Sequence, residues 1–347
     1  MKRVGIIILN WNGKEHLASF LPSVVQHSGE HDIVVVDNNS TDDSVEFLTS
    51  NYPKIKQVHN TSNGGFAKGY NQGLEQIKGE YEVYVLLNSD VEVTANWLEP
   101  ILDKMSQDEA VVACQPKILA YKSKTQFEHA GAAGGFIDKN GYPFCRGRIF
   151  EEIEVDIGQY NQEQEIFWAT GACMFVKSEV FHEVGGFDDS YFAHMEEIDL
   201  CWRMKLHGYK IMAIPSSTVY HLGGGTLNYM SPRKVYLNFR NSLFTLYKNY
   251  RGNFLMGKIT WRFLLDYIAF VAFIANGDFK ASVQILKAQS HFLGKIPEMK
   301  EKRQELKRAT KDIDFNESGF YNRSIVFTHF IKRKKHFSEI DTRIFRK

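Results

Sequence analysis

VGIIILNWNG, at residues 4–13, is a β-branched apolar run that ends abruptly in polar side chains. A run of this kind predicts a buried strand, here over 4–9, with a polar strand end behind it. No GxGxxG sequence follows, and the chain contains no GxxxxGK[ST] sequence. The strand end therefore predicts neither a dinucleotide-binding loop nor a P-loop, and a nucleotide site here would be built from side chains.

Further apolar runs follow at a regular spacing. Strands are predicted at 33–36, 55–59 and 82–87, and helices at 13–26, 44–50 and 66–77. Strands that alternate with helices predict βαβ units, and hence an α/β fold with a mostly parallel, Rossmann-like central sheet flanked by helices. Ligands of such sheets bind at the carboxyl ends of the strands.

Polar side chains lie at three of these strand ends. They are Asn10, Trp11 and Asn12, then Asp37, Asn38 and Ser40, and finally Asn88, Ser89 and Asp90. Asp37 or Asn38 can bind a base or a ribose, and Asp90 can hold Mg²⁺ or Mn²⁺ against a diphosphate or simply cap a helix. In NGGFA, at 63–67, Gly65 lets backbone approach a ligand or only forms a turn, and Asn71 follows one helical turn later.

Acidic residues and a histidine form the second group of candidates. GGFDDSYFAHMEEIDLCWR, at 185–203, places Glu196, Glu197 and Asp199 at the start of a predicted helix that stops near Gly208. Buried acids are costly unless they are paired, bound to metal or used in proton transfer, although acids at this position also complement the helix dipole. His221, in VYHLGGGT, is a candidate metal ligand or a structural residue, and the glycines after it would let backbone pass close to a phosphate.

Two later segments have a different character. Residues 126–168, which include GAAGGF, are irregular in pattern, and we expect them to line or cover a site rather than to form core. Long helices are predicted from about Ser231. Residues 259–275 are very apolar but are interrupted by Arg262 and Asp266, which favours an interfacial or buried amphipathic helix over a spanning one.

Charge divides the chain of 347 residues into two parts. Residues 226–347 contain 24 Lys and Arg but 10 Asp and Glu, whereas residues 1–225 contain 18 basic and 31 acidic residues. We therefore expect a body over 1–225 and a basic, aromatic, helical extension over 226–347 that meets an anionic partner. The four scattered cysteines and the lack of a signal-peptide pattern favour a cytoplasmic protein.

The motifs VVVDNNSTDDS, NGGFAKGYNQG, YVLLNSD, GGFDDSYFAHMEEIDLCWR and VYHLGGG occur in this order within about residues 3–250. Together they resemble the family 2 glycosyltransferases, and most of all the rhamnosyltransferase-like branch that builds bacterial surface polysaccharides. The resemblance implies a GT-A fold, a nucleotide-diphosphate sugar donor, a divalent metal and inversion at the anomeric carbon. The QxxRW motif of processive synthases is absent, which favours transfer of a single sugar.

The resemblance also implies roles for particular residues. Asp90, in the DxD-type motif, and His221 would bind the metal, and Asp37 and Asn38 would contact base and ribose. Glu197 stands where the family commonly has the Asp of a Glu-Asp pair and is the implied general base, with Glu196 and Asp199 as substitutes. Trp168, Thr170, Gly171 and Ala172, in FWATGACMF, are a candidate acceptor floor or a strand that enters the core, and Arg240 and Asn241 are candidates to reach the diphosphate.

The expected partners are a nucleotide-sugar donor carrying dTDP or UDP, a glycan or lipid-linked acceptor and an anionic membrane surface. Lys332–Lys335 would strengthen membrane binding, and the expected location is peripheral, on the cytoplasmic face of the inner membrane. A homo-oligomer is possible and nucleic acid is not expected. The alternatives are a sugar-nucleotide nucleotidyltransferase, a non-enzymatic nucleic-acid-binding or scaffold protein that uses the basic tail, and a family member that has lost activity.

Overall fold

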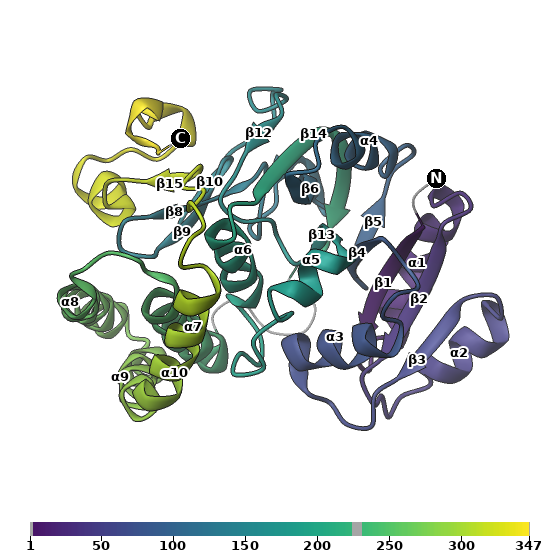
Figure 1. The fold of residues 1–347 in the computed structure, drawn as a ribbon, viewed down its shortest axis with the longest axis horizontal. Coiled ribbons are helices and arrows are strands. Elements are labelled where there is room, and N and C mark those ends of the chain that lie inside the picture. Colours follow the sequence, from purple (N-terminus) through teal and green to yellow (C-terminus); the bar gives the residue numbers. More distant parts are fainter. Residues whose placement is uncertain (1–2, 224–230, 347) are drawn as a thin grey trace.

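The alternation predicted for residues 4–88 is confirmed in the computed structural model, which describes residues 3–223 and 231–346 (Figure 1). Every end of these elements lies within one residue of its predicted position. The strands are β1 (Val4–Asn10), β2 (Asp32–Asp37), β3 (Lys56–His59) and β4 (Val83–Asn88), and the helices are α1 (Lys14–His27), α2 (Ser44–Asn51) and α3 (Gly65–Gln76). All four strands are parallel, and β1 lies between β2 and β4.

Beyond β4 the central sheet is mixed. The strand β13 (Cys173–Lys177) runs antiparallel to β4 and to β6 (Val111–Ala120), and β14 (Lys210–His221) is parallel to β6. Three short strands complete this ten-stranded sheet: β5 (Val91–Val93), β7 (Ser123–Phe127) and β12 (Gln164–Glu165). The helices in this part of the chain are α4 (Glu99–Gln107), α5 (Ser178–Glu183) and α6 (Glu196–Leu206).

Much of residues 126–168 is buried, so the expectation that this segment does not form core is wrong, although one of its residues, Glu128, does lie at the candidate site described below. They supply most of a second sheet, made of β8 (Gly135–Asp138), β9 (Pro143–Cys145), β10 (Arg148–Ile149), β11 (Glu152–Ile153) and β15 (Phe320–Tyr321). Phe136 and Phe144 are buried in it. Strands this short, joined by tight turns, do not give a periodic pattern that sequence alone can resolve.

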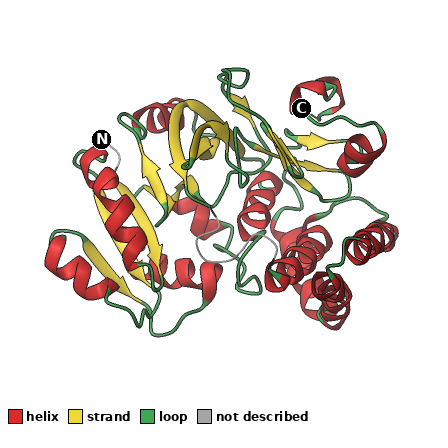
Figure 2. Cartoon of the chain, turned by 180° about the vertical axis from the view of Figure 1, so that it is seen from behind, coloured by secondary structure: helices red, strands yellow, loops and turns green. Residues whose placement is uncertain are grey.

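The basic tail begins with four helices, which gather on the side of the molecule away from α2 and β3 (Figures 1 and 2). They are α7 (Pro232–Asn249), α8 (Leu255–Ala275), α9 (Phe279–Gly294) and α10 (Ile296–Ala309). The predicted boundary at 225/226 lies outside the described residues. Within the part that the structure describes, no helix combines the length and the hydrophobicity needed to cross a bilayer.

The end of the tail is not a free extension. After α10 the chain returns to the second sheet, where β15 pairs in parallel with β8. Three short helical turns follow, at Phe327–Ile331, Phe337–Glu339 and Thr342–Ile344. The rings of Phe337 and Phe345 pack on Phe136, with centroids 4.8 and 5.1 Å away. The tail therefore contributes to the core of the body.

Candidate active site

The first strand ends meet because β1 and β2 are in register, with Asn10 opposite Asp37. The amide Nδ2 of Asn10 donates to Oδ1 of Asp37 at 3.3 Å and to Oγ of Ser40 at 3.2 Å. The backbone N–H of Asn12 also donates to Oγ of Ser40, at 2.9 Å. These side chains bind one another and form a polar floor, whereas Trp11 remains 47% exposed.

The glycine loop connects this floor to the segment before α6. Nδ2 of Asn38 donates to the carbonyl of Gly65 at 3.0 Å. Gly65 has φ +78°, and a Cβ there would lie 2.4 Å from the carbonyl oxygen of Phe192. Asn71 donates to the carbonyl of Phe187 at 2.7 Å and also binds Asp189. Glycine is required where two chains approach so closely, and the Asn71 amide holds the loop that leads into the acidic helix.

Asp90 and His221 come together from distant parts of the sequence. β14 ends beside β5, and Oδ1 of Asp90 lies 3.1 Å from Nε2 of His221. Nδ2 of Asn88 lies 3.5 Å from the same nitrogen. Burial lowers the pKa of His221, but the hydrogen bond to Asp90 and the nearby charge of Glu128 outweigh this effect and raise the pKa to about 10. Of the glycines after His221, Gly224 and Gly225 lie outside the described residues.

Glu128 is a member of this cluster that the sequence did not single out. Its Oε1 lies 3.5 Å from Nδ1 of His221, and its side chain is buried. Carboxylates that contact the second nitrogen of a ligating histidine fix its tautomer and its ring orientation. Glu128 stands in the irregular segment between β7 and β8, where no periodic pattern marked it.

Asp90 and His221 carry donor types that bind divalent cations in proteins. Their separation of 3.1 Å is that of a hydrogen-bonded ion pair, so His221 would have to release its proton for both side chains to hold a cation. Across residues 3–223 and 231–346, no group of three or more His, Cys, Asp or Glu side chains is arranged to hold a metal. An ion here would therefore need further ligands from a diphosphate and water.

The acidic helix presents two neighbouring carboxylates in an unusual setting. α6 begins at Glu196, and the two residues before it, His194 and Met195, both have left-handed φ of +70° and +74°. Glu196 is buried, whereas Glu197 is partly exposed. Burial raises the pKa of both, and the charge of Glu197 raises that of Glu196 further. Oε2 of each carboxyl lacks a hydrogen-bond partner among the described residues.

Asp199, two residues later, has quite different surroundings. Its carboxylate is fully buried and accepts hydrogen bonds from Nε of Arg203 at 3.0 Å and from Nδ2 of Asn249 at 2.8 Å. Nζ of Lys248 lies 2.9 Å from it. These contacts tie α6 to α7 and satisfy the carboxylate, so a structural role accounts for Asp199.

Arg240 and Asn241 hold the backbone that leads into α6. Nη2 of Arg240 donates to the carbonyl of Ser190 at 3.1 Å. Nδ2 of Asn241 donates to the carbonyls of Ala193 and His194, at 2.9 and 2.7 Å. Both side chains are buried and occupied by these contacts, which account for them without the diphosphate contact that the sequence suggested.

The candidate acceptor floor, at residues 168–172, lies between Asn88 and the carboxylates at the start of α6. Trp168 is buried, and its indole N–H donates to the carbonyl of Phe136 at 2.9 Å. Thr170 is buried as well, and its hydroxyl donates to the carbonyl of Ala130. The carbonyl of Ala172 accepts from the backbone N–H of Asn88 at 3.0 Å. A methyl group on Gly171 would lie 3.8 Å from Cβ of Glu197, so Gly171 adjoins the carboxylates.

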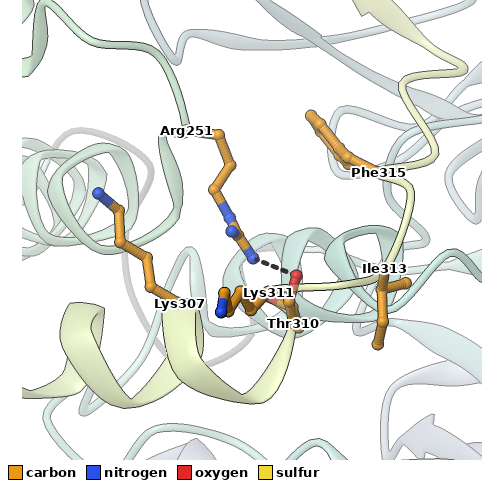
Figure 3. Close-up of a pocket in the computed structure, with 6 residues that line it drawn as sticks. All are labelled: Arg251, Lys307, Thr310, Lys311, Ile313 and Phe315. Carbon is orange, nitrogen blue, oxygen red and sulfur yellow. Dashed lines mark hydrogen bonds between the residues drawn. The ribbon is translucent and has the colours of Figure 1, made fainter.

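A separate basic pocket lies in the tail (Figure 3). It has a volume of about 480 Å³ and is lined by Arg251, Lys307, Thr310, Lys311, Ile313 and Phe315. Nη2 of Arg251 donates to the carbonyl of Thr310 at 3.5 Å, just beyond the C-terminus of α10. Cations gather favourably at the negative end of a helix dipole, which accounts for these side chains without a ligand.

A parallel βαβ half joined to a mixed second half, with acidic residues near the carboxyl ends of the central strands, is the architecture of the GT-A fold. Residues 5–185 match the family model for glycosyl transferase family 2. The chain therefore belongs to glycosyl transferase family 2. This membership replaces the interpretations of the chain as a nucleotidyltransferase or as a non-enzymatic scaffold.

Similar proteins come from bacteria, archaea and animals. An N-acetylglucosaminyl-diphospho-decaprenol L-rhamnosyltransferase of Mycobacterium tuberculosis is 26% identical over 62% of this chain and 75% of its own length. The low-salt glycan biosynthesis hexosyltransferase Agl10 of Haloferax volcanii is 24% identical over 69% of this chain and 73% of its own. Among solved structures, the TarS fragment of S. aureus has a TM-score of 0.55 and 15% identity, covering 90% of this chain and 89% of that one.

Proposed function

We propose that this chain is an inverting, metal-dependent glycosyltransferase that moves one sugar from a dTDP- or UDP-sugar to a hydroxyl of a lipid-linked glycan. The observation that carries the proposal is the pair Glu196–Glu197, whose carboxyl pKa values are raised. This pair adjoins Gly171 of the candidate acceptor floor, and Ala172 of the same floor accepts a hydrogen bond from the backbone of Asn88. Family membership gives the class of reaction, and this pair would supply a proton acceptor for it.

The donor would lie across the ends of β1, β2 and β4. Asp37 and Asn38 are our candidates for base and ribose contacts, and Trp11 offers an exposed ring beside them. Asp90 and His221 would hold Mg²⁺ or Mn²⁺. Such an ion, when bound, neutralises the charge that develops on the departing diphosphate. A mannosyltransferase with TM-score 0.52 to this chain was solved with GDP-Man and Mn²⁺, which is compatible with a metal here.

Glu197 is our candidate for the general base. It keeps some exposure, whereas Glu196 is buried and Asp199 is satisfied by Arg203, Lys248 and Asn249. The acceptor oxygen would attack the anomeric carbon from the face opposite the diphosphate and lose its proton to Glu197. The bond from the anomeric carbon to the diphosphate oxygen breaks with its electron pair on the nucleotide, which inverts the anomeric centre.

A lipid-linked acceptor would place the enzyme at a membrane. The mycobacterial relative acts, by its name, on a glycan carried by diphospho-decaprenol. We propose the same acceptor class for this chain, with peripheral binding to the cytoplasmic face of the inner membrane through the basic tail. Synthesis of a surface polysaccharide is the process that such a transfer would serve.

The direct test is sugar transfer by the purified protein. dTDP- and UDP-sugars would be offered with Mn²⁺ and a lipid-linked glycan, and release of free nucleotide would be measured with and without the acceptor. The proposal requires acceptor-dependent release and an inverted anomeric configuration in the NMR spectrum of the product. A product that retains the donor configuration would refute the mechanism. Nucleotide release at the same rate with and without the lipid-linked glycan would refute the proposed acceptor class.

A further inference from the structure

α8 carries its charges on the inside and its apolar side chains on the outside. Arg262 and Asp266 are buried, and Nε of Arg262 donates to Oδ1 of Asp266 at 2.9 Å. Nη2 of Arg262 also donates to Ser242 on α7, and Tyr142 donates to Asp266. The two charges that interrupt the apolar sequence therefore anchor α8 to the body.

The opposite side of α8 is apolar and exposed. Its outer apolar face consists of Trp261, Leu264, Tyr267, Ile268, Val271 and Ile274, which are 36–65% exposed. Their spacing of three and four residues places them along one stripe of the helix. From 254 to 279, every exposed residue is uncharged. Contiguous exposed apolar surface of this kind marks an interaction site.

Positive charge accompanies the outer apolar face. α9 packs beside α8 and adds the exposed side chains of Phe279, Val283, Leu286 and Leu293. It carries Lys280 and Lys287, both exposed, and has no acidic residue within its bounds. Apolar side chains together with lysines, a tryptophan and a tyrosine match the boundary between headgroups and acyl chains of an anionic bilayer.

We infer that α8 lies in the plane of an anionic phospholipid bilayer, with the outer apolar face inserted between the headgroups. This inference extends the proposed lipid-linked acceptor by naming the surface that brings the enzyme to it. A two-fold dimer through the same face is less favourable, because it would bring the same lysines of the two copies toward one another. Figure 1 shows α8 at the left edge of the molecule.

The inference is tested by sedimentation of the full chain with vesicles, without nucleotide or acceptor, so that it can fail independently of the proposed reaction. Vesicles of phosphatidylcholine, with and without phosphatidylglycerol, are compared. We expect binding that requires phosphatidylglycerol and falls at least about tenfold in the double variant Leu264→Glu, Ile268→Glu. Ile157→Glu is the matched control, because Ile157 is 83% exposed on a different part of the surface and should not affect binding.

Circular dichroism and the thermal midpoint show whether the double variant is folded; both positions are exposed, so neither should change. The inference is overturned if the wild-type protein does not bind anionic vesicles, or if a folded double variant binds them as well as the wild type does. Light scattering provides the third readout. A wild-type dimer that the double variant converts to monomer, without vesicle binding by either, would assign the face to a second copy instead.

Discussion

Glu197 is the side chain on which the proposed chemistry depends most. In Glu197→Gln the amide keeps the shape of the side chain but does not accept a proton, so turnover should fall about 10²- to 10⁴-fold. Nucleotide affinity should stay within about twofold, because Glu197 is not among the proposed donor contacts. The rate of acceptor-dependent nucleotide release measures the first effect, and calorimetry measures the second. Near-normal turnover in the variant would exclude Glu197 as the base.

Glu128 provides a second test at the residue scale, because it contacts His221 rather than the proposed donor. Glu128→Gln removes the charge that faces Nδ1 of His221, and nucleotide affinity in the presence of Mn²⁺ should weaken about 10- to 100-fold. In EDTA the variant and the wild type should not differ, because the metal through which Glu128 acts is then absent. Glu109→Gln, at an exposed position, is the control. An unchanged affinity with Mn²⁺ would mean that Glu128 does not position His221 for a metal.

At the residue scale, the sequence singles out those site residues whose side-chain chemistry and position along the chain both indicate a role. Asp90, His221, Glu196 and Glu197 could be selected because each follows a strand end or begins a helix. Glu128 could not, because its importance comes from a contact with His221, a residue 93 positions later in the chain. The satisfied state of Asp199 depends likewise on Lys248 and Asn249, which only the packing of α7 on α6 brings near.

At the scale of elements, α7 fixes the start of α6. The left-handed residues His194 and Met195 each cost about 1–3 kcal/mol and persist only where their surroundings hold them. Asn241 supplies that support through its two hydrogen bonds to the carbonyls of Ala193 and His194. The orientation of Glu196 and Glu197 therefore depends on a helix that lies beyond the family match at 5–185.

Asn241→Ala should lower kcat at least about tenfold, since a small displacement of a catalytic group has a large effect on rate. The free energy of unfolding should decrease by about 1–3 kcal/mol, and nucleotide affinity should change little. Denaturant titration and steady-state kinetics separate these effects. Asn238→Ala on the same helix is the control. A variant that loses stability but keeps its kcat would show that α7 supports the fold without positioning the carboxylates.

The elements that the sequence predicts well are those long enough to repeat a periodic apolar pattern several times. The strands and helices of residues 4–88 and the helices of the tail repeat apolar positions often enough to be recognised. The two-residue strands β10, β11 and β15 do not, and they exist because Phe136 and Phe144 pack against Phe337 and Phe345 from the far end of the chain. Contacts over such a separation leave no local pattern.

For the whole molecule, the tail and the body share one core. Phe337 is buried against Phe136 and Phe144, so Phe337→Ala should lower the free energy of unfolding by about 3–5 kcal/mol. The unfolding of body and tail should shift together, as followed by circular dichroism and by tryptophan fluorescence. Phe330→Ala, at an exposed position, should have little effect. If Phe337→Ala left the unfolding transition of the body unchanged, the tail would be an independent folding unit.

The central claim is a sugar-nucleotide site completed by a divalent metal at Asp90 and His221. Calorimetric titration of dTDP and UDP into the purified protein, first with Mn²⁺ and then with EDTA, tests it most directly. We predict tight binding of at least one nucleotide with Mn²⁺, loss of that binding in EDTA, and the same loss in Asp90→Ala. Failure of both nucleotides to bind, or binding that neither EDTA nor Asp90→Ala weakens, would contradict the claim.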